Sequence, residues 1–200
     1  MVLVSFGDLF VNGVVNRFGA NILTAFVTCL KVQNVATGFY NNIAGAFAIF
    51  AGQNFGARKM ERIRDGFRKV ASVVAALSIV SAVVIFQFNT YFVGAFLSKS
   101  DPNYAEIIAA SDLNLKIAAV FFPVLALIWL YNETLRGFGE VKVPFISSMI
   151  EVVIKIGLSW IMAETVGWIG VWFVCPIGWV LGIIPSAVRF HRGRWMREQK

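Results

Sequence analysis

The sequence predicts an all-α membrane protein: a six-helix lobe with five complete spanning helices and a partial first helix. Of the 200 residues, 58% are hydrophobic and 14% are charged, and the mean hydropathy is +0.72. Soluble domains are about 45–50% apolar and about 25% charged. Long apolar runs also alternate with short polar breaks, and roughly 20 apolar residues cross a hydrocarbon core. These observations exclude a disordered chain and a disulfide-stapled secreted module, and they disfavour a soluble enzyme.

The polar breaks divide residues 1–189 into transmembrane helices, and a basic tail follows at residues 190–200. In order, the helices are expected at about 1–17, 20–53, 67–97, 104–132, 144–163 and 165–189. The first would be about 25 Å long at 1.5 Å per residue, which is short of the hydrocarbon core, so we expect the chain to start inside a spanning helix. The fourth contains Pro123, which kinks a membrane helix without ending it.

Lysine and arginine residues gather on one side of the predicted membrane. Because successive helices alternate in direction, the loops after the second and fourth helices share a side with the tail. That side carries thirteen of the eighteen basic residues, and the other side carries two, Arg17 and Lys99. Cytoplasmic loops are enriched in Lys and Arg, so we expect a multi-pass protein of the inner (plasma) membrane with a cytoplasmic C-terminus. The basic surplus is explained by orientation in the lipid bilayer, and no nucleic-acid partner is expected.

No catalytic or metal-binding set is recognisable in the sequence. It contains no Walker loop and no Ser/His/Asp or Cys/His grouping for nucleophilic chemistry. Cys29 and Cys175 stand alone in apolar runs, without the spacing of metal ligands. We therefore expect no enzyme, no catalytic residue, no metal and no cofactor. Transport driven by a gradient of sodium ions or protons, or a lipid-facing role, remains.

Three polar residues of the first helix share one face, because Asp8, Asn12 and Asn16 recur at every fourth position. Polar side chains inside a membrane are costly and usually face the bundle interior or a water-filled cavity. Asp8 has no cation within one turn, and a proton or sodium ion would relieve the cost of burying its carboxylate. Asp8 is therefore a cation-coupling candidate, with a place near the membrane interface as the alternative. Asn12 and Asn16 are cavity-lining candidates.

One face of the second helix is polar near its outer end and rich in glycine near its inner end. Asn34, Asn41 and Asn42 are cavity-lining candidates, with simple interhelical hydrogen bonding as an equal alternative. Glycines at helical spacing allow a neighbouring helix to approach closely. The candidates for such helix packing are Gly38, Gly45, Gly52 and Gly56.

Two acid–base pairs lie inside the predicted membrane, Asp112 with Lys116 and Glu151 with Lys155. In both, the acid precedes the base by four residues, which is the favourable orientation for an ion pair on a helix. We expect two intramembrane ion pairs. They either neutralise each other structurally or form a cation relay whose pairs open and close.

Several short motifs, each weak alone, resemble those of the multidrug and toxic compound extrusion (MATE) transporters and follow the same order. Val15–Gly19 resembles the junction of that family's helices seven and eight, and Gln53–Lys59 resembles its QNxGAxx cytoplasmic loop. Leu135–Glu140 resembles the LRGxG loop after helix ten. Further along, Glu151 and Lys155 match acidic and basic positions of helix eleven, and Gly167–Trp172 resembles the pattern of helix twelve.

The resemblance implies the C-terminal lobe of a transporter that has two six-helix lobes around a central cavity. An N-terminal six-helix lobe is then the expected partner, supplied by the same polypeptide, a separate chain or a homodimer mate. The implied function is secondary active efflux of drugs or organic cations by antiport with sodium or protons. Some relatives bind sodium through acids of helices seven and ten, which makes Asp112 a second cation-coupling candidate. The sequence departs from the family at Asn12, where Gln is frequent, and at Lys155, where Arg is common.

Two other functions stay open. A flippase of the same superfamily, for lipid-linked oligosaccharides or peptidoglycan precursors, would line its cavity with several cations. Here the predicted helices hold Lys31, Lys116 and Lys155, and two of these have acidic partners. A truncated remnant that inserts without transporting is the second alternative. The sequence leaves open the substrate, the coupling ion, the oligomeric state, whether the chain is a fragment and whether it transports alone.

Overall fold

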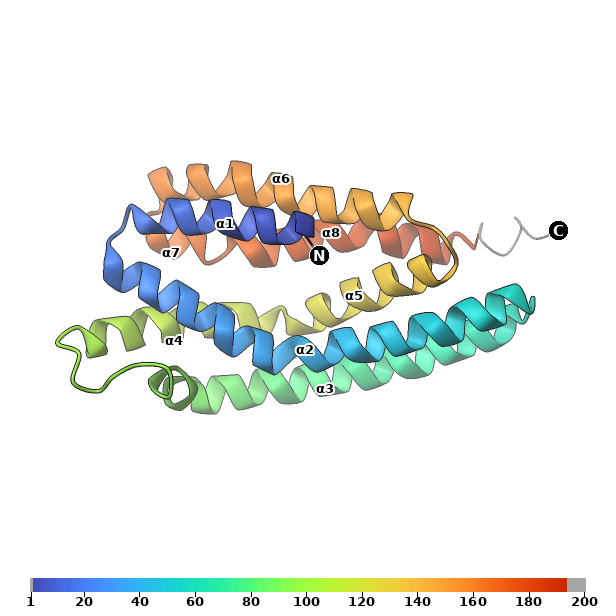
Figure 1. The fold of residues 1–200 in the computed structure, drawn as a ribbon, viewed down its shortest axis with the longest axis horizontal. Coiled ribbons are helices and arrows are strands. Elements are labelled where there is room, and N and C mark those ends of the chain that lie inside the picture. Colours follow the sequence, from blue (N-terminus) through green and yellow to red (C-terminus); the bar gives the residue numbers. More distant parts are fainter. Residues whose placement is uncertain (1, 194–200) are drawn as a thin grey trace.

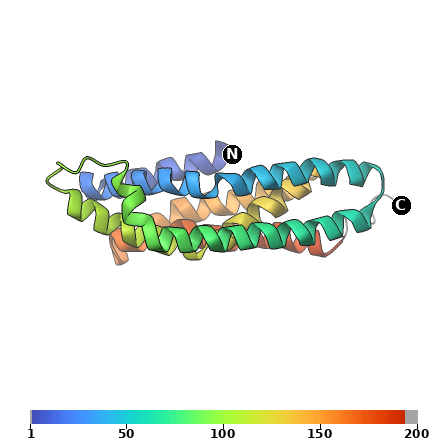
Figure 2. The same cartoon turned by 90° about the horizontal axis from the view of Figure 1, so that it is seen from below.

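The structure is a computed structural model that describes residues 2–193, with side chains from residue 5 onward. Within that part every regular element is a helix, and the helices form one elongated bundle (Figures 1 and 2). The elements are α1 (Val2–Asn16), α2 (Ala20–Gly56), α3 (Met60–Gly94), α4 (Tyr104–Val120), α5 (Phe122–Gly137), α6 (Lys142–Thr165), α7 (Trp168–Val171) and α8 (Val174–His191). The predicted all-α class is confirmed.

Five segments of the described chain are long and apolar enough to cross a membrane, if the bent pair α4–α5 counts as one. The others are α2, α3, α6 and the segment Trp168–His191, which contains α7 and α8. Helix α1 has 15 residues, about 22 Å at the usual rise, and is shorter than the roughly 30 Å core. Five complete spans and a shorter first helix therefore agree with the sequence.

Several helices extend past the bounds expected from the sequence. Helix α3 begins at Met60 rather than at residue 67, and α5 continues to Gly137 rather than ending at residue 132. The last expected helix, 165–189, is split, because α6 includes Thr165 and the short α7 precedes α8. Hydropathy marks where a helix enters the apolar layer. It does not mark where backbone hydrogen bonding starts, so polar turns continue these helices beyond their apolar runs.

The fourth span is bent at its middle, where the sequence places a proline. Helices α4 and α5 meet at Phe121 with an angle of 52° between their axes. Pro123 has no amide hydrogen to donate to the preceding turn, and the amide of Phe121 donates to the carbonyl of Ala118 at 2.9 Å. The kink expected at this proline is present as a break between two helices.

The connections between helices fall at two opposite ends of the bundle. Figure 1 shows the α2–α3 and α5–α6 turns at the end where α8 finishes, and the α1–α2, α3–α4 and α6–α7 connections at the other. The helices thus alternate in direction, as the charge count assumed. Glu140 beside α5 accepts from Arg189 of α8 at 2.8 Å, which ties two elements at the first end. Other basic residues at that end are Arg58, Lys59, Arg62, Arg64, Arg136, Lys142 and Arg192.

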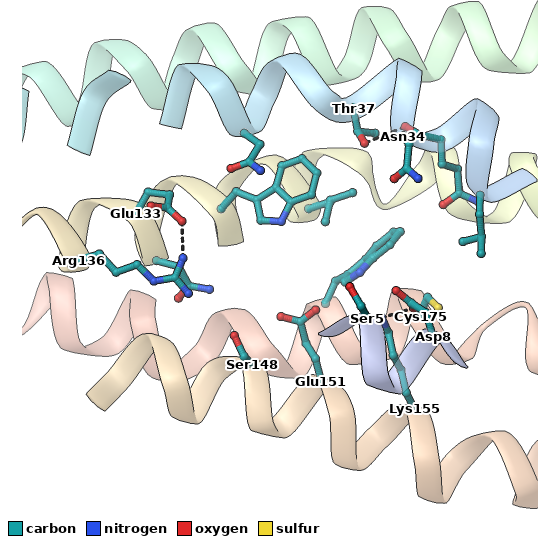
Figure 3. A pocket seen from close by; sticks show the side chains of 17 residues that line it. Ser5, Asp8, Asn34, Thr37, Glu133, Arg136, Ser148, Glu151, Lys155 and Cys175 are labelled. Atoms are coloured by element: carbon teal, nitrogen blue, oxygen red, sulfur yellow. Dashed lines mark hydrogen bonds and ion pairs between the residues drawn. The ribbon is translucent and has the colours of Figure 1, made fainter. Parts of the chain in front are cut away.

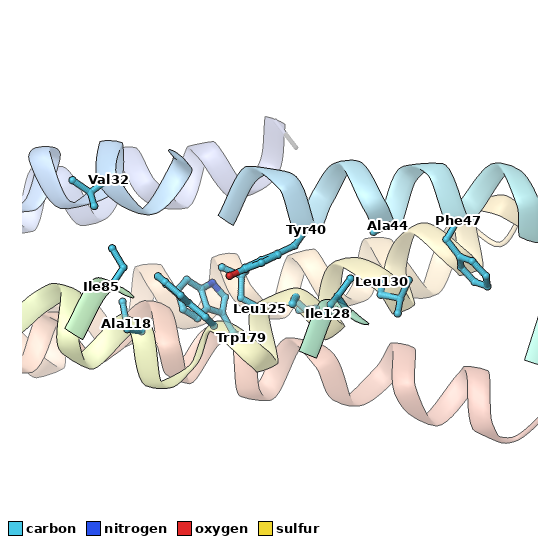
Figure 4. Packing of buried hydrophobic residues seen from close by; sticks show 14 of the residues in the cluster. Val32, Tyr40, Ala44, Phe47, Ile85, Ala118, Leu125, Ile128, Leu130 and Trp179 are labelled. Atoms are coloured by element: carbon cyan, nitrogen blue, oxygen red, sulfur yellow. The ribbon is translucent and has the colours of Figure 1, made fainter. Parts of the chain in front are cut away.

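Buried apolar side chains pack between α2, α3, α5 and α8. Tyr40 and Phe47 of α2 lie among the side chains of this cluster, which also contains Leu130 of α5 and Trp179 of α8 (Figure 4). The outer surface of α3 is also apolar, with Val73, Ile79, Val80, Val83, Phe86 and Phe88 exposed. Large exposed apolar surfaces are unusual on soluble proteins. This one is typical of a helix that faces lipid.

The glycines of α2 differ in whether a neighbouring helix lies close to them. A Cβ built at Gly52 would lie 2.8 Å from the carbonyl oxygen of Gly137, so this glycine lets α2 and α5 approach closely. A Cβ at Gly38, Gly45 or Gly56 would meet nothing within 4 Å in the chain. Within the described part of the chain, Gly52 therefore makes a close helix contact and the other three make none. Their helix-packing role stays a prediction.

Candidate functional site

A cavity of about 260 Å³ lies between α1, α2, α5, α6 and α8 (Figure 3). One wall is α2, which contributes the polar side chains of Asn34, Thr37 and Asn41. Trp129 of α5 and Trp179 of α8 add aromatic surface, of the kind that can bind an organic cation through its π face. The charged lining residues are Asp8, Glu133, Arg136, Glu151 and Lys155.

An ion pair joins α1 to α6 at one end of this cavity. Lys155 Nζ donates to Asp8 Oδ1 at 2.5 Å, and the side chains are 3% and 33% exposed, respectively. A Cβ at Gly7 would lie 2.9 Å from Lys155 Cδ, so this glycine leaves room for the lysine to run along α1. The predicted pair within α6, Lys155 with Glu151, is corrected. Helix packing brings a carboxylate from another helix, and the lysine is bonded to that one.

Glu151 is buried and faces the cavity without a hydrogen-bond or ion-pair partner among the described side chains. Its relative exposure is 6%. A Cβ at Gly182 of α8 would lie 2.8 Å from Glu151 Cγ, so this glycine provides the space that the side chain occupies. A buried carboxylate without a partner is costly unless it gains a proton or a cation. The cavity therefore holds a place where a positive charge is favoured.

The opposite end of the cavity contains a second ion pair. Glu133 accepts a hydrogen bond from Arg136, one turn further along α5 (Figure 3). The cavity thus has three carboxylates and two basic groups, and both basic groups are paired. Glu151 is the carboxyl group left without a basic partner among the described side chains.

A buried hydrogen-bond network fixes α5, α6 and α8 next to Glu151. Asn132 Nδ2 donates to Ser147 Oγ at 3.2 Å, and Ser147 Oγ donates to the carbonyl of Gly182 at 2.6 Å. Ser186 Oγ donates to Asn132 Oδ1 at 2.5 Å. Asn132 also lines the cavity, so its amide joins the wall of the site to the helix contacts behind it.

Replacing Asn132 with leucine is expected to lower the free energy of unfolding by about 1–2 kcal/mol, because two buried hydrogen bonds between membrane helices are lost. The check is unfolding by a denaturant in detergent, with the loss of helix monitored by circular dichroism. Asn42→Leu is the matched control, because Asn42 is exposed and has no part in the network. Equal losses in the two variants would contradict a structural role for the network.

The residues predicted from the sequence are divided between the cavity and other places. Asp8, Asn34, Asn41, Glu151 and Lys155 line the cavity. Asn12, Asn16 and Asn42 do not line this cavity, and their cavity-lining role stays a prediction. A helix turns by about 100° per residue, so Asn41 faces the cavity while its neighbour Asn42 is exposed. Spacing alone could not show which face of α1 is turned toward α2.

The expected pair of Asp112 and Lys116 is present on α4. Lys116 Nζ lies 2.8 Å from Asp112 Oδ1, and the side chains are 41% and 29% exposed, respectively. Neither residue lines the cavity. The pair needs no third group to balance its charge, and the cation-coupling role of Asp112 stays a prediction.

Sequence reasoning missed several lining residues for two reasons. Gln33 and Thr37 are spaced by one helical turn on α2, and the same spacing that selected Asn34 and Asn41 could have found them. Glu133 and Arg136 were placed beyond the end of the fourth helix, whereas α5 continues through both.

The family model described as MatE matches residues 1–161. The chain belongs to the MatE family. The probable multidrug resistance protein NorM of Deinococcus radiodurans is 27% identical over 177 residues, which are 87% of this chain and 39% of that protein. The probable multidrug resistance protein YpnP of Bacillus subtilis is 21% identical over 196 residues, 98% of this chain and 43% of that protein.

Solved structures show the same MatE fold. A MOP superfamily transporter from Pyrococcus furiosus superposes with a TM-score of 0.88 at 18% identity, covering 100% of this chain and 44% of that one. The Vibrio cholerae MATE transporter VcmN in its bent form superposes with a TM-score of 0.85 at 17% identity, covering 98% of this chain and 44% of that one. The chain spans about two fifths of the length of the curated relatives it matches. It matches one lobe of these multi-pass membrane proteins, as the motif order predicted.

Proposed function

We propose that this chain supplies the C-terminal half of a secondary active transporter. The transporter exports drugs or organic cations by antiport with sodium ions or protons. The observation that carries the proposal is Glu151, a buried carboxylate that faces the cavity without a hydrogen-bond or ion-pair partner among the described side chains. The multidrug resistance named for its relatives supports the substrate class. The absence of a nucleotide-binding loop in the sequence supports an ion gradient, and not nucleotide hydrolysis, as the source of energy.

Charge exchange is the proposed mechanism. A coupling cation and a cationic substrate compete for the same excess negative charge, so each leaves when the other arrives. A ligand shifts a conformational equilibrium only as far as its affinities for the two states differ. Binding at Glu151, between α6 and α8, would bias the packing of these helices, and thereby the access of the cavity to one side of the membrane.

The partner and the orientation follow from the same reasoning. An N-terminal six-helix lobe would cover the open side of the cavity, from the same polypeptide, a separate chain or a homodimer mate. The basic end of the bundle supports a cytoplasmic C-terminus in an inner (plasma) membrane. The acidic excess in the cavity argues against an anionic, lipid-linked substrate, and we propose no enzymatic activity.

The test is uptake of ethidium, an organic cation, into inverted membrane vesicles that contain the native polypeptide carrying this chain, because export from the cell corresponds to uptake into such vesicles. Imposing a sodium or a proton gradient should drive ethidium accumulation, and the gradient that succeeds identifies the coupling ion. Asp8→Asn and Glu151→Gln should each abolish gradient-driven transport while the protein still inserts, since each removes charge from the cavity. Retained transport in Glu151→Gln, or loss in Asp112→Asn alone, would overturn the assignment of coupling to this cavity.

A further inference from the structure

Lys155 lies between two carboxylates that belong to different helices. Its ammonium is bonded to Asp8 of α1 at 2.5 Å, and Glu151 precedes it by one turn on α6. Side chains at i and i+4 on a helix are within reach of each other. The ammonium can therefore be bonded to either acid through a change in its own side-chain conformation, with α6 in place.

Glycines on the facing helices give these side chains their space. Gly7 of α1 lies against Lys155, where a Cβ would come within 2.9 Å of Cδ. Gly182 of α8 lies against Glu151, where a Cβ would be 2.8 Å from Cγ and 3.3 Å from Oε1. Any larger residue at these positions would crowd the lysine stem or the carboxylate. Both groups thus occupy room that the neighbouring backbone leaves open.

Asp8, Glu151 and Lys155 together contain two acids and only one base. Lys155 is 3% exposed and needs a carboxylate at all times, because an unpaired buried charge is strongly unfavourable. Whichever acid it leaves must find another cation or a proton. With the lysine on Asp8, the vacant acid is Glu151, which is 6% exposed. With the lysine on Glu151, the vacant acid would be Asp8, whose side chain is 33% exposed.

We propose that Lys155 is a tethered cation that exchanges between Asp8 and Glu151, so that the carboxylate it leaves binds a free monovalent cation. The site accepts a metal ion, or the ammonium group of an organic cation, at a deep or a shallow position according to where the lysine lies. This inference rests on the proposed function, because it assigns the binding of the transported cation to two acids that share one lysine.

A cysteine already present in the cavity allows a test without transport. Cys175 of α8 lines the same cavity, whereas Cys29 is fully buried elsewhere. In a Cys29→Ala background, the full chain in membranes is treated with cationic and anionic methanethiosulfonate reagents of similar size. The ratio of the two labelling rates reports the local charge. Asn34→Cys in a chain without the native cysteines is a second reporter, because Asn34 lines the opposite wall and is exposed.

The parent chain should react faster with the cationic reagent. Asp8→Asn and Glu151→Gln should each lower the rate ratio about tenfold, the order expected when one unit charge several ångströms away is removed at low effective dielectric. Lys155→Gln should raise it by a similar factor. The matched controls Asp112→Asn and Lys116→Gln should leave the ratio unchanged, because this second acid–lysine pair lies outside the cavity.

The proposal requires that both acids contribute their charge to the same cavity. If Asp8→Asn left the ratio unchanged while Glu151→Gln lowered it, Asp8 would not act on the cavity and the proposal would be overturned. No change in either variant would likewise overturn it. Sodium chloride or tetraethylammonium chloride should slow cationic labelling of the parent chain. The comparison is a buffer of equal ionic strength that contains neither sodium nor a quaternary ammonium ion. The labelling result stands apart from the efflux assay, so failed transport with an intact charge preference would contradict the proposed function alone.

Discussion

The double variant Asp8→Asn/Glu151→Gln is expected to lose about 3–5 kcal/mol of unfolding free energy, the cost of leaving a buried charge without its partner. Lys155 is 3% exposed, and the double variant removes both carboxylates within its reach. Each single variant leaves one carboxylate to which the ammonium can be bonded. The loss in the double variant should therefore exceed the sum of the two single losses by more than 1 kcal/mol, about the coupling of groups that share a partner.

The parent chain, the two single variants and the double variant are each unfolded by a denaturant in detergent. The four unfolding free energies give the coupling energy between Asp8 and Glu151 directly. Adding Lys155→Met to the double variant should recover most of the lost stability, because the buried charge is then gone while the stem volume is kept. The Asp112–Lys116 pair provides the comparison, with side chains 29% and 41% exposed. Breaking it should cost less than the double variant loses, since neither side chain is as deeply buried as Lys155. Strictly additive single losses at Asp8 and Glu151 would show that Lys155 does not depend on both acids.

Most of the fold is readable from the sequence because the bilayer imposes a coarse rule. Each span must be apolar over a nearly fixed length and must satisfy its own backbone hydrogen bonds, so hydropathy locates α2, α3 and α6 well. Pro123 marks the bend between α4 and α5 for the same local reason. Helix ends are less readable, since the polar turns from Met60 and up to Gly137 are helical outside the apolar runs.

The site was only partly readable because its decisive contacts join helices that are far apart in sequence. The residue types were found, and Asp8, Glu151 and Lys155 were all singled out. Their pairing was not, since spacing within α6 favours Glu151 as the partner of Lys155 while the packing of α1 on α6 places Asp8 there. The contacts at the glycines likewise depend on how the helices pack in three dimensions. Gly7 and Gly182 make room for the charged side chains, and nothing in their local sequence indicates it.

Alanine at Gly52 is expected to destabilise the chain, whereas alanine at Gly38 in the same helix is expected to stabilise it or leave it unchanged. Alanine gains about 1 kcal/mol of helix propensity over glycine at both positions. At Gly52 the new Cβ would lie 2.8 Å from the carbonyl oxygen of Gly137, and separating two backbones costs typically about 1–3 kcal/mol. At Gly38 nothing lies within 4 Å, so propensity acts alone.

Thermal unfolding of the two variants in the same detergent measures this difference, with Gly137→Ala as a second probe of the contact. That variant should be the most damaging of the three, because its Cβ would meet the backbone carbonyl of Ala48 on α2. Equal melting temperatures for Gly52→Ala and Gly38→Ala would refute the close approach of α2 and α5. Both helices line the cavity, and Arg136 at its end immediately precedes Gly137. The glycine contact therefore sets how the α2 and α5 parts of the lining lie relative to each other, and widening it should also weaken cation binding in the cavity.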